Sequence, residues 1–174
     1  SSASFARIVE VTDTPLVPHT GIDTTPLTGA LEVAGVSMVY GEQEVLKNIS
    51  FNIRPGEKVA IIGPTAAGKT QLLYLLTALT TQTGGTIRYD GKDISQIDLP
   101  TLHNHIGFVF QDSVLFNTTL KENIAFNAER TEKGDVAFER AVQTAELADF
   151  IESLAKGLDT IVSERGTTLS GGQK

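Results

Sequence analysis

The chain has 174 residues, 40% of them hydrophobic, which is enough for one globular domain with its own core and unlike a disordered or fibrous composition. Its formal net charge is −7 without a long basic stretch, which argues against a nucleic-acid groove but not against a single nucleotide, since one nucleotide needs only one or two cations. Cysteine is absent, so disulfides, cysteine zinc sites and thiol catalysis are excluded.

The first 29 residues have the composition of a tail and a linker rather than of a folded core. Residues 1–11 can form a short helix with its apolar residues on one side. Residues 12–29 are rich in threonine, proline and glycine, which favours an extended linker. We therefore place the start of the domain near Ala30.

The following residues have the pattern of an α/β fold. Residues 31–40 predict an extended region, and residues 49–53 alternate between apolar and polar as a half-buried strand does. The run at 58–62, which is apolar after Lys58, and the run at 106–110 predict strands buried in a parallel sheet. A further strand is predicted at 86–89.

Helices are predicted on both sides of the second apolar run. Leucines at helical spacing predict a helix over 69–80, whose densest apolar stretch is far too short to span a bilayer. Towards the C-terminus, helices are predicted at 120–126, 135–147 and 150–154, joined by polar loops. The front of the chain is therefore predicted to be α/β and the back to be a helical subdomain.

A phosphate-binding loop is predicted between the strand at 58–62 and the helix at 69–80. Residues 63–70 read Gly-Pro-Thr-Ala-Ala-Gly-Lys-Thr and match the phosphate-loop pattern in that context. Small residues let successive backbone N–H groups point inward at an anion, and the helix start aims its dipole at the same place. Lys69 supplies a charge that can reach the β- and γ-phosphates, and the hydroxyl of Thr70 can bind Mg²⁺.

A second glycine motif, Leu-Ser-Gly-Gly-Gln at 169–173, lies about a hundred residues beyond the loop. Alone it is compatible with a flexible turn, although adjacent glycines before a helix can also expose backbone donors to a phosphate. Together with the phosphate loop, this pentapeptide resembles the signature of the ATP-binding domains of ABC transporters. The resemblance spans Ala30 to the last residue.

This resemblance implies a fold and a division of the chain. The fold is α/β, a P-loop NTPase (RecA-like) core with an antiparallel β subdomain and an α-helical subdomain, incomplete at the C-terminus. Residues 1–29 are then a tail and linker from the membrane domain, and residues 30–174 are a truncated ATP-binding domain. Within it, 30–111 form the α/β core and 112–174 the helical subdomain that ends at the signature.

The resemblance also implies ATP and Mg²⁺ as cofactors. The family's adenine-stacking aromatic falls on Tyr40, which could otherwise be a strand-end tyrosine that covers the core. The family's Q-loop glutamine, which touches Mg²⁺ and the attacking water, falls on Gln111. Ala66 replaces a usual glycine, so its backbone must avoid a positive φ or accept strain. The resemblance implies Lys69 and Gln111 as catalytic residues, and Thr70 and Gln111 as ligands of the metal. The implied nucleotide-binding residues are Tyr40, Gly63, Pro64, Thr65, Ala66, Ala67, Gly68, Lys69, Thr70, Gln71, Ser170, Gly171, Gly172 and Gln173.

Two segments resemble exporters in particular, and they imply the partners. Residues 112–124 and 162–166 would face the transmembrane domain, at the cytoplasmic face of a membrane. In the second segment, Glu164 and Arg165 could instead be a solvent-exposed charge pair. The other implied partner is a second ATP-binding domain in a head-to-tail dimer, with ATP between the phosphate loop of one and the signature of the other. No nucleic-acid partner is expected.

The family's Walker B aspartate and catalytic glutamate are expected to follow the signature, so they fall outside this sequence. Asp90, Asp93, Asp98 and Asp112 lack the apolar strand that defines Walker B, and His103-Asn104-His105 has no carboxylate pattern for a metal site. We therefore expect nucleotide binding without efficient hydrolysis. We also expect unpaired apolar faces at 58–62 and 106–110, and a stable form that depends on further chain, rearrangement or association.

Two other functions remain open at this point. One is a soluble ABC-type ATPase that acts on nucleic acid or ribosomes, which the acidic charge and the exporter-like segments disfavour. The other is a nucleotide-binding module without catalysis, or an inert fragment. Nucleic-acid binding would identify the first of these, and turnover of bound ATP would exclude the second.

Overall fold

The computed structural model describes residue 9, residues 20–111, 114–126 and 132–162, and residues 169 and 172. The chain divides into two units, residues 1–107 and residues 108–174. Of the short helix expected at 1–11, Val9 is described and is helical. The predicted division at 29 and 111 remains a prediction.

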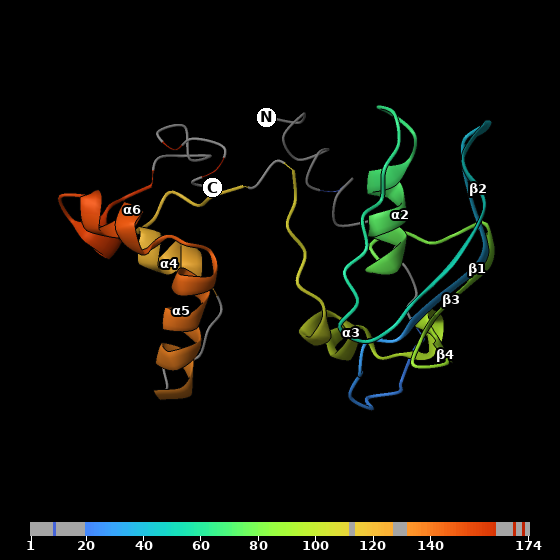
Figure 1. The fold of residues 1–174 in the computed structure, drawn as a ribbon, viewed down its shortest axis with the longest axis horizontal. Coiled ribbons are helices and arrows are strands. Elements are labelled where there is room, and N and C mark those ends of the chain that lie inside the picture. Colours follow the sequence, from blue (N-terminus) through green and yellow to red (C-terminus); the bar gives the residue numbers. More distant parts are fainter. Residues whose placement is uncertain are drawn as a thin grey trace. The chain divides into compact units, whose positions relative to one another are not determined.

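The first unit is built on a four-stranded antiparallel sheet with the strand order β2-β1-β3-β4 (Figure 1). The strands are β1 (Leu31–Tyr40), β2 (Gln43–Ile53), β3 (Gly84–Tyr89) and β4 (Lys92–Asp93). A tight turn joins β1 to β2 at Gly41, whose φ of 62° favours glycine. The strands expected at 31–40, 49–53 and 86–89 are confirmed, and β4 is an addition to them.

The core of the first unit lies between this sheet and its helices. The helical elements are α2 (Lys69–Leu76), η1 (Ile94–Gln96) and α3 (Leu99–His105). Fully buried side chains come from each layer: Val33, Val36 and Ile87 from the strands, Leu75 from α2, and Ile97 and Leu102 from the region of η1 and α3. Each such burial stabilises the fold by about 1.5–3 kcal/mol, so α2 is held mainly by its leucines.

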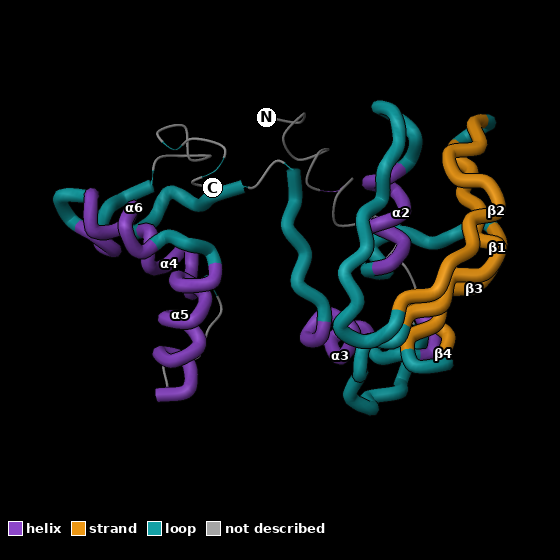
Figure 2. The backbone as a smooth tube through the Cα atoms, viewed as in Figure 1, coloured by secondary structure: helices purple, strands orange, loops and turns teal. Residues whose placement is uncertain are grey.

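The apolar runs at 58–62 and 106–110 are not strands, and the expectation of two buried parallel strands is wrong for the described residues. Neither run forms a strand, and Figure 2 draws both as loops. Ile62 is 92% exposed and Val109 is 91% exposed. A β-branched run becomes a strand only where neighbouring strands accept its hydrogen bonds, and in the described ranges none does so. Much of their apolar surface is exposed, at Val59, Ile61, Ile62 and Val109, whereas Ile106 packs against the core.

Helix α2 ends at Leu76 rather than at the predicted residue 80. The hydroxyl of Thr77 donates to the carbonyls of Leu73 and Tyr74, at 3.2 and 3.1 Å, which closes the last turn. The buried hydroxyl of Tyr89 donates to Leu76 O at 2.8 Å, and burial raises the pKa of Tyr89 to about 12. These side chains satisfy carbonyls that a helix end leaves unpaired.

The histidine pair is structural in this unit. His103 Nε2 lies 2.9 Å from Thr77 O, and His105 Nδ1 lies 2.8 Å from Thr101 O. A carbonyl only accepts, so each ring nitrogen donates. Among the described residues, no group of three or more potential metal ligands lies together.

Part of the predicted linker is held against the first unit. The carboxylate of Asp90 accepts hydrogen bonds from the backbone N–H groups of Thr28 and Ala30, at 2.6 and 3.0 Å. Lys92 Nζ lies 2.7 Å from Asp23 Oδ2, and the backbone of Asp23 pairs with Ile97. A hydrogen bond from the Lys92 ammonium, with others from Thr25, holds the pKa of Asp23 well below its usual range.

The second unit is helical, as predicted from the sequence. Its elements are α4 (Leu120–Ala125), α5 (Glu132–Thr144), α6 (Ala148–Ser153) and η2 (Gly157–Asp159), each within a few residues of a predicted helix except for η2. A capping box between Thr119 and Glu122 starts α4. Within the described ranges, no helix has the length and the apolar character to cross a membrane.

Asp90→Asn should destabilise the first unit. Burial raises the pKa of Asp90, but hydrogen bonds from Thr28, Ala30 and Gly29 lower it more, so its pKa lies below the ordinary value. The stability that Asp90 contributes is therefore complete above the unfolded pKa of about 3.9 and is lost as the pH falls through the folded pKa. We expect a loss of about 1 kcal/mol in urea unfolding at pH 7, which shrinks towards pH 2.

Glu42→Gln, in the exposed turn between β1 and β2, is the matched control for the loss of one carboxylate. It should change the unfolding free energy by less than about 0.5 kcal/mol. An Asp90→Asn effect that stays constant from pH 7 to pH 2 would contradict the proposed role of the ionised carboxylate.

Candidate functional site: the phosphate loop

The loop at 63–68 leads directly into α2, and the backbone conformation of Gly68 sets the direction in which the chain enters the helix. Gly68 is the N-cap residue of α2 and has a φ of 83°. A Cβ on this residue would lie 2.8 Å from Val45 O and 2.8 Å from Leu46 Cδ2. Only glycine fits both the left-handed backbone and this approach of β2. The Gly68 carbonyl accepts from Leu72 N at 2.9 Å, which begins the helix.

The backbone of Ala66 is strained, which is one of the two alternatives for an alanine at this position. Its φ is 63°, in the left-handed region where a side chain crowds the following carbonyl. The neighbouring turn is closed by Ala67 N, which donates to Pro64 O at 3.3 Å. The loop therefore has its curled form despite the alanine, at a conformational cost of about 1 kcal/mol.

The ammonium group of Lys69 lies over the loop. Its Nζ donates to Gly63 O at 2.9 Å and to Pro64 O at 2.6 Å. An ammonium has three donors, and these two bonds use two of them. A positive charge is thus held above the residues whose backbone N–H groups form the loop, next to the positive end of the α2 dipole. This combination favours an anion at the helix start.

A hollow of about 300 Å³ opens at this point. It is lined by residues 66–71 and by Gln43 and Val45 of β2. In the sheet register Gln43 pairs with Tyr40, so the hairpin brings Tyr40 to the strand end next to this hollow. The side chain of Tyr40 is 78% exposed, so it does not cover the core. Thr70 is exposed at the start of α2.

Gln43 and Val45 were not foreseen from the sequence. Neither residue belongs to a recognisable motif, and their place at the hollow comes from the hairpin that folds β2 back along β1. The turn at Gly41 is the signal that could have predicted it, because a tight turn fixes which residues lie opposite each other.

The other expected site residues lie in the second unit. Gln111 is described and exposed, beyond the apolar run at 106–110. In the signature, Gly172 is exposed, whereas Ser170, Gly171 and Gln173 lie outside the described residues. Glu164 and Arg165 also lie outside them. The phosphate-loop residues and Tyr40 thus lie in the same unit of the structure, whereas the signature is established only as a sequence motif.

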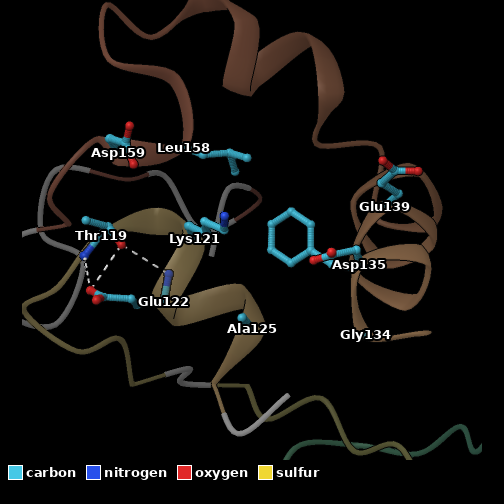
Figure 3. Close-up of a pocket in the computed structure, with 10 residues that line it drawn as sticks. Thr119, Lys121, Glu122, Ala125, Gly134, Asp135, Glu139, Leu158 and Asp159 are labelled. Carbon is cyan, nitrogen blue, oxygen red and sulfur yellow. Dashed lines mark hydrogen bonds between the residues drawn. The ribbon is translucent and has the colours of Figure 1, made fainter. Parts of the chain in front are cut away.

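A larger cavity of about 800 Å³ lies within the helical unit (Figure 3). Figure 3 shows Lys121, Glu122 and Ala125 of α4 on one side and Asp135 and Glu139 of α5 on the other. Its ten lining residues include four carboxylates and one lysine, and they form no glycine loop that could hold a phosphate. Its charge does not suit a nucleotide, so the smaller hollow at the phosphate loop is the better nucleotide site.

A curled glycine loop, a helix that starts at a left-handed glycine and a lysine over the loop define the class of P-loop nucleotide-binding proteins. A family model described as ABC transporter matches residues 46–174. The chain belongs to the ABC transporter family.

The similar proteins agree with this membership. ATP-binding cassette sub-family B member 6 of Mus musculus is 42% identical over 174 residues, which is 98% of this chain and 20% of that protein. The β-(1→2)glucan export ATP-binding/permease protein NdvA of Rhizobium etli is 42% identical over 84% of this chain and 25% of its own length. The ATP-dependent lipid A-core flippase of Syntrophus aciditrophicus is 36% identical over 99% of this chain and 29% of its own length.

A solved structure of a bacterial Atm1-family ABC exporter with ATP bound has a similar fold. The TM-score is 0.81 and the sequence identity 34%, over 99% of this chain and 31% of that chain. This chain therefore spans between a fifth and about a third of the length of these similar proteins. The expected P-loop core with an antiparallel sheet and a helical part is confirmed as the fold.

Ala66→Gly should stabilise the chain. Glycine has no Cβ to strain a φ of 63°, and this gain exceeds the entropy that glycine adds to the unfolded chain. We expect a gain of about 0.5–1 kcal/mol in urea unfolding. Ala67→Gly, one residue along and without a positive φ, should instead lose about 0.5–1 kcal/mol. Equal effects of the two changes would show that Ala66 is not strained.

Proposed function

We propose that this chain is the ATP-binding domain of an ABC exporter, which couples the binding and hydrolysis of ATP to transport across a membrane. The observation that carries the proposal is the Lys69 ammonium held over a curled glycine loop at the start of α2. The similarity to proteins named as exporters supports the direction of transport. Since the chain matches a fraction of each relative's length, transport is a property of the larger protein.

The phosphates of ATP fit the hollow at the loop. The residues that line it carry one cation and no carboxylate, and they include the hydroxyl of Thr70. The backbone N–H groups of residues 63–68 would bind the phosphate oxygens, with Gln71 next to them on α2, and Lys69 would exchange its loop carbonyls for phosphate oxygens. Bound Mg²⁺ would neutralise phosphate charge, and Thr70 and Gln111 would be its ligands.

Adenine would stack on Tyr40. An exposed tyrosine ring at a strand end offers a flat apolar face to a base, and the register of β1 with β2 brings that strand end to the hollow. A ring that covered the core would be buried instead.

The partners follow from the signature and from the two exporter-like segments. A second ATP-binding domain would pair head to tail, so that Ser170, Gly171, Gly172 and Gln173 of each domain bind the γ-phosphate held by the other. The transmembrane domain would contact residues 112–124 and 162–166, and the chain would lie at the cytoplasmic face of a membrane.

These 174 residues should bind ATP and hydrolyse it very slowly on their own. Phosphoryl transfer depends on positioning a water and stabilising charge, and a carboxylate normally contributes to both. The residues that line the hollow include a lysine and a threonine but no carboxylate. Binding without turnover is therefore the proposed activity of the isolated chain.

A nucleic-acid ABC protein is the second candidate, and no observation favours it. The net charge of −7 lowers the affinity for a polyanion, and three of the similar proteins are named as an export protein, a flippase and an exporter.

Lys69→Ala should weaken ATP binding, measured by titration calorimetry with Mg²⁺, by at least about tenfold, because a charge-assisted hydrogen bond to phosphate is lost. Lys58→Ala, an exposed lysine outside the loop, is the matched control and should change the affinity by less than about twofold. Phosphate release from the same samples should stay near the uncatalysed rate. Equal affinity in Lys69→Ala and the unchanged chain would contradict the proposal.

Tyr40→Ala should weaken ATP binding by about tenfold, because one base stacked on an aromatic ring is worth about 1–3 kcal/mol. Tyr40→Phe retains the ring and should bind within about twofold of the unchanged chain. Inorganic triphosphate, which has no base, should bind both variants equally well. If Tyr40→Ala binds ATP as tightly as Tyr40→Phe does, the ring does not hold adenine.

A further inference from the structure

The carboxamide of Asn123 holds the loop that precedes its own helix. Asn123 Oδ1 accepts from Phe116 N at 2.8 Å. Its Nδ2 donates to Phe116 O at 3.0 Å, to Thr118 Oγ1 at 3.2 Å and to Thr119 O at 3.0 Å. Both ends of one side chain therefore bind this loop, at the backbone of Phe116 and Thr119 and at the hydroxyl of Thr118.

The same loop pairs with a segment about forty residues further along the chain. Leu120 N donates to Thr160 O at 2.8 Å, and Val162 N donates to Thr118 O at 2.8 Å. Thr119 and Ile161 form the antiparallel bridge between these bonds. The side chains of Leu120 and Val162 are buried next to it. Two backbone hydrogen bonds thus join residues 118–120 to residues 160–162.

The capping box does not explain this arrangement. Glu122 accepts from Thr119 N and from the Thr119 hydroxyl, at 3.1 Å each, and Thr119 caps the helix in return, as the dashed lines in Figure 3 show. These bonds start α4, but they do not reach Phe116 or Thr118. The Asn123 side chain does reach this part of the loop, at Phe116 and at Thr118.

We propose that Asn123 is a positioning residue that makes residues 116–120 and 160–162 one body, so that a displacement of either segment moves the other. Its carboxamide donates to the Thr118 hydroxyl and bonds Phe116 and Thr119 on either side, and the carbonyl of Thr118 accepts from Val162 N. The purpose of this link rests on the proposed function, because residues 116–120 lie within the part of the chain at 112–124 that we assign to the transmembrane domain, and residues 160–162 lead into the other part at 162–166. A displacement of one of these segments by the transmembrane domain then displaces the other segment as well.

The chemistry requires an amide at this position. One end of the side chain must accept a hydrogen bond from a backbone N–H group, while the other must donate to two carbonyls and a hydroxyl. A carboxylate of the same shape could accept but not donate, and it would repel the carbonyls of Phe116 and Thr119. Asn123→Asp is therefore nearly isosteric, removes the donors and adds one negative charge.

The test is site-resolved amide hydrogen exchange on the chain without nucleotide, so a failure of ATP binding leaves it unaffected. In Asn123→Asp, the amide of Val162 should exchange about tenfold faster, because it opens when Thr118 loses its support. The amides of Ala145 and Ile151, which are bonded within α5 and α6, should be unchanged. The structure gives no bond between the Asn123 side chain and Val162. Faster exchange at Val162 alone would therefore show that the loss of the Asn123 donors acts on Val162 through the loop.

Asn117→Asp is the matched control, because it adds the same charge to the same loop from an exposed side chain. It should leave the exchange of Val162 within about twofold. If Phe116 exchanges faster in Asn123→Asp while Val162 does not, the two segments are independent and the proposal is wrong. If Val162, Ala145 and Ile151 all accelerate equally, Asn123 serves general stability only, which also overturns it.

Thr118→Val provides a second, milder variant should Asn123→Asp lose its helical circular dichroism. It removes one of the acceptors of Asn123 Nδ2 and leaves the carbonyl of Thr118 in place. Val162 should then exchange about threefold faster, with Ala145 unchanged. An unchanged rate at Val162, or an equal rise at Ala145, would count against the proposal in this variant as well.

Discussion

The close approach of β2 to the phosphate loop at Gly68 is the contact on which the first unit depends. The 2.8 Å from a notional Gly68 Cβ to Val45 O leaves no room for a side chain, so α2 begins directly against the sheet. That placement lets the leucines of α2 pack on Val33, Val36 and Ile87. The hydrophobic core and the anion site are consequently two results of one backbone contact.

Strain and polar contacts are concentrated at the ends of elements. Ala66 adopts a left-handed backbone in the loop before α2, where a curled chain is needed to bring N–H groups together. At the other end of α2, Thr77 and Tyr89 satisfy the last carbonyls. In the helical unit, the side chain of Asn123 likewise satisfies backbone groups, but those of a loop rather than of a helix end. The apolar layers supply stability, and these polar contacts set the geometry.

The local patterns predicted most of this fold. Alternation and turn residues located β1, β2 and β3, and helical spacing located α4, α5 and α6, although bounds moved by a few residues. Helix α3 was missed, despite a signal in Asp98, whose side chain caps the helix, and Pro100 in its first turn. The runs at 58–62 and 106–110 were wrongly predicted as strands, because a strand exists only with a partner, and a partner is not a local property of sequence.

By itself, the sequence indicated a phosphate loop, because small residues, a lysine and a threonine at fixed spacing are dictated by the shape and charge of a phosphate. The pentapeptide at 169–173, together with that loop, gave the resemblance to ABC transporters. Only the tertiary structure decided that Ala66 is left-handed, that Gln43 lines the hollow and that Asn123 joins two distant segments. The reason is physical. Motif chemistry acts between neighbours in the chain, whereas register, close approach and shared hydrogen bonds arise between residues that meet only after folding.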